Sequence, residues 1–270
     1  MLFVTACNQE SKKNRERPSL FKSGPYPFLQ KQLKPDSLKL MYPWSKWNVQ
    51  NFRPKLAGIA YFENNNGDTL QFIYTSFSED FLAFGFFKKY APQKFRENFY
   101  IDGEQLVFRN IETVGVLTFT NQGPWNMSKI ETFKQSFPVS FDKPSVFDSF
   151  PIKNRLKNTE AVYPRFFLGK DYIGDVISVK FPCFYDTAEV FRTWFNPKQR
   201  VFRALAKDFI GETERKDNGK LFVFKGFTDF DIPVVLYGYQ NGLLGVYGCN
   251  DKETAEFYIK KVMSMDALLY

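Results

Sequence analysis

Four Asn-Gly or Asp-Gly dipeptides separate short apolar runs, and no other feature constrains the fold of this 270-residue chain as strongly. Such dipeptides adopt the positive φ angles that two-residue hairpin turns require. A hairpin joins two antiparallel strands, so each dipeptide predicts one antiparallel pair. The four dipeptides are Asn66-Gly67, Asp102-Gly103, Asn218-Gly219 and Asn241-Gly242.

The apolar runs around these turns have the length of single strands and are rich in Phe and Val. The chain holds 33 Phe, and large aromatic and β-branched side chains favour sheets. We therefore predict strands over residues 70–74, 105–108, 114–119, 176–181, 221–224 and 234–237.

Apolar residues spaced three or four apart predict three helices in the second half of the chain. Two of them begin with a short polar side chain and a Glu three positions later, a pattern that caps helices: Asp186 with Glu189, and Asn250 with Glu253. The three apolar faces consist of Ala188, Phe191, Trp194 and Phe195, of Phe202, Leu205 and Phe209, and of Ala255, Tyr258, Ile259 and Val262.

Two stretches of the chain match at an offset of 107 residues. Residues 67–87 and 174–194 each begin with Gly-Asp and continue as a predicted strand and a predicted helix. Further on, residues 102–108 resemble residues 218–224. The match indicates an internal repeat. The alternative is that two Phe-rich segments of sheet and helix look alike through composition alone.

These patterns predict an α+β fold of two tandem similar lobes, each an antiparallel sheet with helices packed on one face. We place the first lobe at residues 51–145 and the second at residues 146–270. Residues 1–7 are interpreted as the remnant of a signal peptide, and residues 8–50 as a basic tether and an irregular lead-in, because prolines recur there. A duplicated lobe without an obvious catalytic residue favours a binding scaffold.

The first residues contain a candidate membrane address. Val4-Thr5-Ala6-Cys7 resembles the end of a bacterial lipoprotein signal peptide, which implies that Cys7 is lipidated and anchors the chain to a membrane. Only six uncharged residues precede Cys7, whereas the apolar part of a complete signal has about 7–15 residues. We expect translation to start upstream of Met1; the alternative is a chance tetrapeptide.

Positive charge is concentrated behind Cys7. Between Glu10 and Lys39 the chain has eight basic and three acidic residues, a net charge of +5 out of +8 for the whole chain. Beside a lipid anchor this segment would lie against anionic headgroups; otherwise it is a solvated linker. Since the excess lies here and no recognition motif accompanies it, we do not expect nucleic acid as a partner.

The chain has no histidine, and this excludes the commonest catalytic designs. Ser-His-Asp and Cys-His arrangements cannot form, and a zinc site would need scattered cysteines and carboxylates. The usual Gly-rich phosphate-binding motifs are missing from the sequence. We therefore expect no catalytic residue, no cofactor and no metal. The alternative is a histidine-independent enzyme that uses carboxylates in a cleft between the lobes.

Two cysteines of the second lobe are candidates for a disulfide. Cys183 and Cys249 each end a predicted strand. With Cys7 taken by lipid, an even pair remains, which an oxidising compartment would join. The alternative is a pair of ordinary buried thiols.

Two further pairs of side chains could contribute to a site. Asp229 and Asp231 could act as paired carboxylates, or they could form the solvent face of a loop before Pro233. Trp44 and Trp47 could form a binding surface, or they could pin the lead-in onto the core.

The body of the chain also resembles a two-lobed family of envelope proteins of unknown function, in the segments Glu79–Phe87, Phe166–Gly169 and Gly245–Gly248. Together with Val4–Cys7, this resemblance implies a lipoprotein of the cell envelope of a Gram-negative bacterium, facing the periplasm or the exterior. We expect it to bind an unknown envelope component without catalysing a reaction. A cytoplasmic protein is the alternative.

Overall fold

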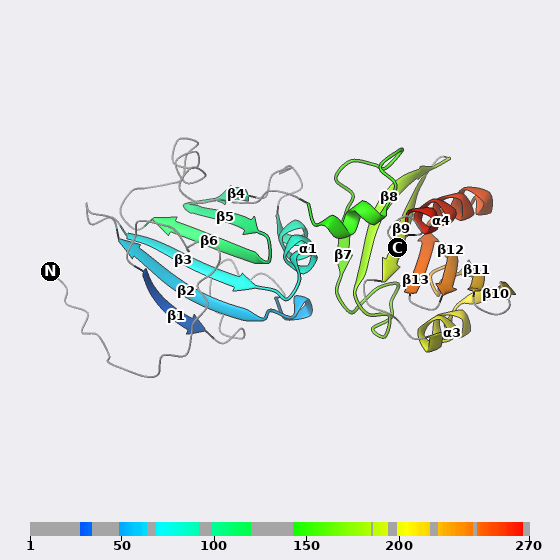
Figure 1. The fold of residues 1–270 in the computed structure, drawn as a ribbon, viewed down its shortest axis with the longest axis horizontal. Coiled ribbons are helices and arrows are strands. Elements are labelled where there is room, and N and C mark those ends of the chain that lie inside the picture. The colour runs from blue at the N-terminus through cyan, green and yellow to red at the C-terminus, as the bar shows by residue number, and fades with distance from the viewer. Residues whose placement is uncertain are drawn as a thin grey trace.

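The structure, a computed structural model, contains two antiparallel sheets with one helix between them (Figure 1). It describes residues 28–33, 49–63, 69–91, 99–119, 143–184, 186–193, 199–216, 221–239 and 242–266. The expected α+β class, built on antiparallel sheets, is confirmed at this level.

The first sheet has six strands in the order β1-β2-β3-β6-β5-β4. The hairpin predicted at Asp102-Gly103 is confirmed, because Asp102 pairs with Gln105 across the turn and Gly103 has a φ of 60°. All three strands predicted in this part of the chain are present. The strands are β1 (Phe28–Leu33), β2 (Leu56–Glu63), β3 (Thr69–Ser76), β4 (Phe99–Asp102), β5 (Gln105–Asn110) and β6 (Thr113–Phe119).

The second sheet has seven strands in the order β10-β11-β12-β13-β9-β8-β7. The antiparallel pairing of β10 with β11 and of β12 with β13 confirms that two hairpins form here. Gly242, however, lies in β13 opposite Tyr239 and not in the turn, and Asn218-Gly219 lies outside the described residues. The strands are β7 (Ala161–Tyr163), β8 (Val176–Cys183), β9 (Asp186–Thr193), β10 (Ile210–Lys216), β11 (Leu221–Phe227), β12 (Pro233–Tyr239) and β13 (Gly242–Tyr247). They are accompanied by the helices α3 (Gln199–Asp208) and α4 (Lys252–Asp266) and by the 3-10 turn η5 (Ser145–Ser149).

The two sheets share one strand order. In each, three consecutive strands form a meander and a helix follows. The chain then returns through antiparallel strands until the last of them pairs with the third strand of the meander. Thus β6 pairs with β3, and β13 pairs with β9. The second sheet has one additional strand, β10, at its edge.

The helix predicted around Ala188 and Phe191 is wrong, because this segment forms β9. The apolar spacing was misleading since β9 is buried on both faces of the sheet: Ala188 and Val190 contribute to one core and Phe191 to the other. The preceding turn contains Phe184, at a φ of 48°, in place of the glycine or asparagine that usually marks such a turn. Asp186 therefore begins a strand and caps no helix.

The register of the expected repeat also needs correction. An offset of 107 residues places β3 on β8 and α1 on β9. The strand order instead matches β3 with β9, because these two strands hold the same place in their sheets. Helix α3, between β9 and β10, holds the place in the second sheet that α1 holds in the first. Phe202 and Leu205, which the sequence places on its apolar face, are buried.

The segment expected to be an irregular lead-in contains a strand. Strand β1 pairs antiparallel with β2 over six residues, from Phe28 with Phe62 to Leu33 with Ala57. Pro27 precedes this strand and Pro35 follows it, so no proline falls within it. Strand β1 is an edge strand, where a nearby proline is tolerated.

Helix α1 (Asp80–Tyr90) lies between the two sheets (Figure 1). Seven consecutive residues, Phe81–Phe87, are buried, which is the pattern of a helix covered on every side. The helix contacts β5 and β6 of the first sheet and β7 of the second. Gly85 allows the close approach to β7, since a Cβ atom there would lie 2.9 Å from Cγ2 of Val162. The two sheets thus share one continuous core.

The second sheet is covered on both faces, where the sequence predicted helices on one face only. Helix α4 and η5 cover the face that includes Val190 and Val246. Helix α3 and the loop between β7 and β8 cover the opposite face, with Phe191 and Leu236 beneath them. Strands such as β9 carry apolar side chains on both sides, so each side needs a cover.

Candidate functional site

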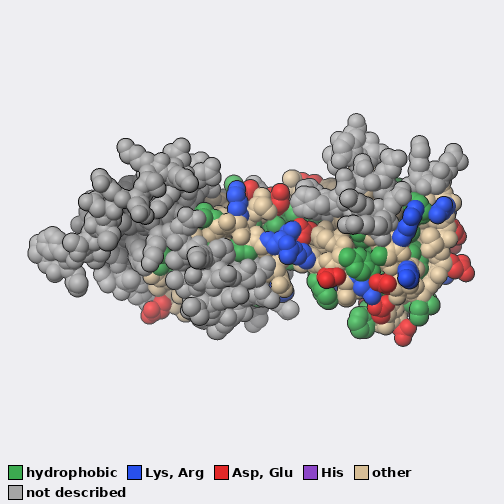
Figure 2. Space-filling view, turned by 90° about the horizontal axis from the view of Figure 1, so that it is seen from below, with side chains coloured by type: hydrophobic (Ala, Val, Ile, Leu, Met, Phe, Trp, Pro, Cys, Tyr) green, Lys and Arg blue, Asp and Glu red, His purple; other side chains and the backbone are tan. Residues whose placement is uncertain are grey.

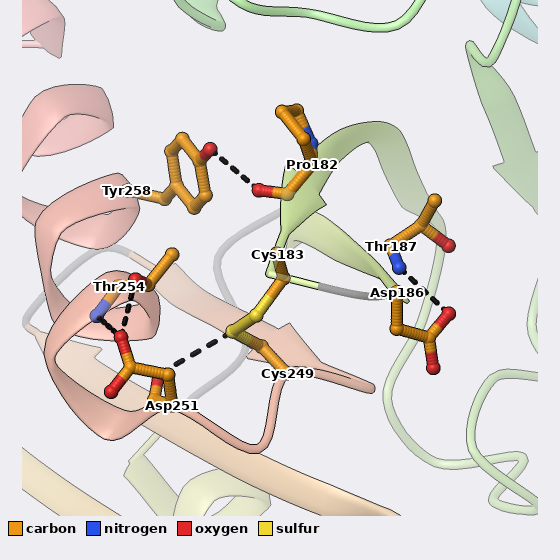
Figure 3. Close-up of a disulfide and its surroundings, with 8 residues drawn as sticks. All are labelled: Pro182, Cys183, Asp186, Thr187, Cys249, Asp251, Thr254 and Tyr258. Carbon is orange, nitrogen blue, oxygen red and sulfur yellow. Dashed lines mark hydrogen bonds between the residues drawn. A yellow bond between two sulfur atoms is a disulfide. The ribbon is translucent and has the colours of Figure 1, made fainter.

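Cys183 and Cys249 are joined in a disulfide that connects the end of β8 to the segment before α4 (Figure 3). Their Cα atoms are 5.8 Å apart, and 66 residues separate them in the sequence. Both side chains are buried, each 4% exposed. Sγ of Cys249 lies 3.4 Å from the carbonyl oxygen of Asp251, a contact and not a hydrogen bond, because a disulfide sulfur carries no proton.

The same region holds the start of α4 in place (Figure 3). Asp251 accepts hydrogen bonds from the backbone N–H of Thr254, at 2.9 Å, and from its hydroxyl. These bonds lower the pKa of Asp251. The cap is therefore Asp251 and not the predicted Asn250. One turn further, the Tyr258 hydroxyl donates to the carbonyl oxygen of Pro182, at 2.8 Å.

Ion pairs of partly buried groups bridge the two lobes. Arg53, between η4 (Val49–Phe52) and β2, pairs with Asp175, whose side chain is 2% exposed. Lys88 of α1 lies 3.4 Å from the carboxylate of Glu160 and also donates to the Glu160 carbonyl oxygen, at 2.8 Å. Lys143 pairs with the same carboxylate. The contacts of Lys88 thus join α1 to Glu160, directly before β7.

Both burial and neighbouring charges shift the pKa values of Lys88 and Glu160 in this interface. Burial lowers the pKa of Lys88 by more than the nearby Glu160 raises it. Burial alone would raise the pKa of Glu160, but the hydrogen bond from Lys143, a backbone hydrogen bond and the two lysine charges outweigh it, so the pKa of Glu160 falls below its ordinary value. Glu160 therefore stays charged, with Lys143 as its stronger partner.

The structure does not bring Asp229 and Asp231 together as an acid–base pair in a cleft. Both lie in the exposed turn between β11 and β12, and β11 is five strands away from β7, the strand that contacts α1. Thr228 organises the turn, since its hydroxyl accepts from the backbone N–H of Phe230 and of Ile232, each at 3.3 Å. This position fits the solvent-facing loop that the sequence also allowed.

Asp229 instead belongs to a surface cluster around Lys170. The Lys170 ammonium lies 2.8 Å from Asp229 and 3.4 Å from Asp208, which also accepts from the Tyr172 hydroxyl at 2.6 Å. The hydrogen bond to Asp229 raises the pKa of Lys170. Exposed hydrophobic and charged side chains alternate over the face of the second lobe seen in Figure 2. Near this cluster, Phe230 is 72% exposed.

Strand β9 carries a buried carboxylate, Glu189, which the sequence predicted as part of a helix cap and not as a core group. It is 4% exposed. Three hydroxyl groups donate to it: Ser178 at 2.5 Å, Tyr247 at 2.7 Å and Tyr163 at 2.8 Å. The ring of Phe167 covers the group, 4.8 Å from Tyr163 and 5.6 Å from Tyr247 between centroids.

This arrangement stabilises the fold and leaves little scope for acid–base chemistry. Burial, and then the Glu189 charge, raise the pKa of Tyr163 and of Tyr247 far above that of a free phenol. Both tyrosines thus keep their hydroxyl protons at ordinary pH and remain hydrogen-bond donors. The spacing of Asp186 and Glu189 predicts a helix cap, whereas both residues lie in strand β9 and Glu189 is buried.

The remaining predicted site residues, Cys7, Trp44 and Trp47, lie outside the described residues, as do Trp194 and Phe195 of the predicted helix face. Across the described ranges there is no group of three or more potential metal ligands. Within the same ranges, the helices are too short or too polar to cross a membrane.

Comparison with known protein families, with curated proteins and with solved structures found no match to this chain.

Proposed function

We propose that this chain is an exported, lipid-anchored protein of the cell envelope of a Gram-negative bacterium, with a binding or scaffolding role and no catalytic activity. The observation that carries the proposal is the pairing of Cys183 with Cys249. Disulfides persist in oxidising compartments and are rare in the cytosol. Their pairing leaves Cys7 as the odd cysteine, at the position that a lipid anchor would use.

Three further features support this role. The basic segment that follows Cys7 would be attracted to anionic headgroups by about 1 kcal/mol per cation near the surface. The two buried glutamates, Glu160 and Glu189, are engaged in structural ion pairs and hydrogen bonds. The common strand order of the two sheets supports our proposal that the chain contains two repeats of one design, the second extended by β10 and α4.

The test is to express the gene with its native upstream codons in a Gram-negative host and to fractionate the cells. We expect the protein in the membrane fraction, with a diacylglyceryl mass increment on Cys7. A Cys7→Ser variant should lose both and remain soluble in the periplasm, with Cys183 and Cys249 resistant to alkylation until a reductant is added. A cytosolic protein with unmodified Cys7 and freely alkylated Cys183 and Cys249 would overturn the proposal.

A further inference from the structure

Strand β10 forms one edge of the second sheet and is exposed along its whole length. All seven residues, Ile210–Lys216, are solvent-exposed. Strand β10 pairs with β11 on its inner side, and within the described part of the chain no strand pairs with its outer side. The opposite edge of the sheet, β7, is in contact with α1. Figure 1 shows β10 at the end of the molecule that lies away from α1.

An open edge of this kind presents backbone N–H and C=O groups that an added strand can bind. Seven residues correspond to about 23 Å of edge at the usual rise of a strand. The ligand that fits such a row of backbone groups is therefore an extended polypeptide. Side chains on β10 and beside it then select the sequence of that polypeptide.

One end of the edge offers an apolar contact. Ile210 is 71% exposed and pairs with Phe227, which is 46% exposed. Next to them, Gly211 pairs with Gly226, and the ring of Phe224 extends so close that a Cβ atom on either glycine would lie 2.8 Å from its Cζ. The glycines thus keep this end free of side chains that would obstruct an incoming strand.

The rest of the edge carries charge in a fixed order. Glu212 and Glu214 lie on one face of β10, and Lys216 on the same face is 3.4 Å from Glu214. On the other face, the Arg215 guanidinium lies over the ring of Phe222, 5.3 Å from its centroid. An antiparallel strand that places lysines opposite the two glutamates would form cross-strand pairs of opposite charge.

The same charges disfavour a second copy of this chain. Two β10 strands paired over their full length about Thr213 would place Glu212 of each copy opposite Glu214 of the other. Like charges directly opposite each other destabilise a strand pair. The edge is therefore better suited to a different polypeptide than to itself.

We propose that β10 is the docking site of an extended segment of another protein, whose lysines face Glu212 and Glu214 and whose acidic residues face Arg215 and Lys216. This segment adds to the second sheet as an antiparallel strand with an apolar residue against Ile210 and Phe227. This inference rests on the binding role proposed above. It does not rest on the lipid anchor.

The experiment uses the purified full chain and the peptide Glu-Glu-Lys-Thr-Lys-Tyr-Val, whose lysines stand opposite Glu214 and Glu212 in the antiparallel register. The matched control peptide exchanges every Glu and Lys. We expect the first peptide to bind at least tenfold more tightly by titration calorimetry or NMR. The variant Glu212→Lys/Glu214→Lys should abolish that preference, because each peptide then faces two like and two opposite charges on β10. Both positions are exposed, so the change leaves the core intact.

Two peptides with backbone N-methyl groups on alternate residues separate strand addition from simple charge attraction. Methylation of the edge that faces β10 should abolish binding, and methylation of the other edge should leave it unchanged. Equal binding of the two methylated peptides, no binding at millimolar peptide, an undiminished preference in the double variant, or self-association of the chain that the double variant abolishes would each overturn the inference. These assays do not involve Cys7, so their failure is distinct from a failure of membrane anchoring.

Discussion

Removal of the disulfide between Cys183 and Cys249 provides the most demanding test of the second lobe. The bond closes a loop of 66 residues. In the chain-entropy treatment, a loop of this length restricts the unfolded chain by about 4 kcal/mol at 25 °C. For a chain of this size, such a loss corresponds to a fall in Tm of about 10 °C.

The perturbation is Cys183→Ala/Cys249→Ala, measured by urea denaturation against the oxidised wild type. Alanine leaves only a small cavity at these two buried positions, so most of the loss should come from the missing cross-link. The reduced wild type, unfolded in the presence of a reductant, is the matched control, because it keeps both sulfur atoms in place. It should lose nearly as much stability as the double variant.

The two measurements together decide the argument. If the reduced wild type and the double variant both stay within about 1 kcal/mol of the oxidised protein, the cross-link does not constrain the unfolded chain as the loop-closure argument requires. If only the double variant is destabilised, local packing and not the bond accounts for the effect.

Three further substitutions test the core and its charges. Gly85→Val would place methyl groups against Val162 and should cost about 1–3 kcal/mol in chemical denaturation, a loss that Val162→Ala should partly restore. The pKa of Glu160 lies below its ordinary 4.5, so the ionised carboxylate stabilises the fold above that pH, and this contribution is lost as the pH falls through the lowered value. The difference in unfolding free energy between wild type and Glu160→Gln should therefore shrink as the pH falls through the lowered value. A difference independent of pH would refute the pairing. Glu189→Leu leaves three hydroxyl groups, those of Ser178, Tyr163 and Tyr247, without their acceptor. It should cost more than Tyr247→Phe, which removes one hydrogen bond worth about 1 kcal/mol; equal losses in thermal unfolding would contradict the network.

Burial on two faces explains where sequence reasoning failed. The segment at Ala188 has the apolar spacing of a helix, and its neighbours in the sheet, β8 and β13, lie on either side of it only after folding. Period-two alternation disappears when both faces of a strand are apolar. For the same reason Glu189 looked like a capping residue, although its partner Tyr247 is 58 residues away in the sequence.

The sequence by itself determined what depends on neighbouring residues. Turn dipeptides set the hairpins, apolar runs set most strands, and helical spacing set α3 and α4, because these signals act within a few residues. The tertiary structure alone decided that α1 is covered by both sheets, that the second sheet has helices on both faces and that β10 is its edge strand among the described residues. Each of these properties depends on contacts between segments far apart in the chain, and no local pattern records which segments will meet.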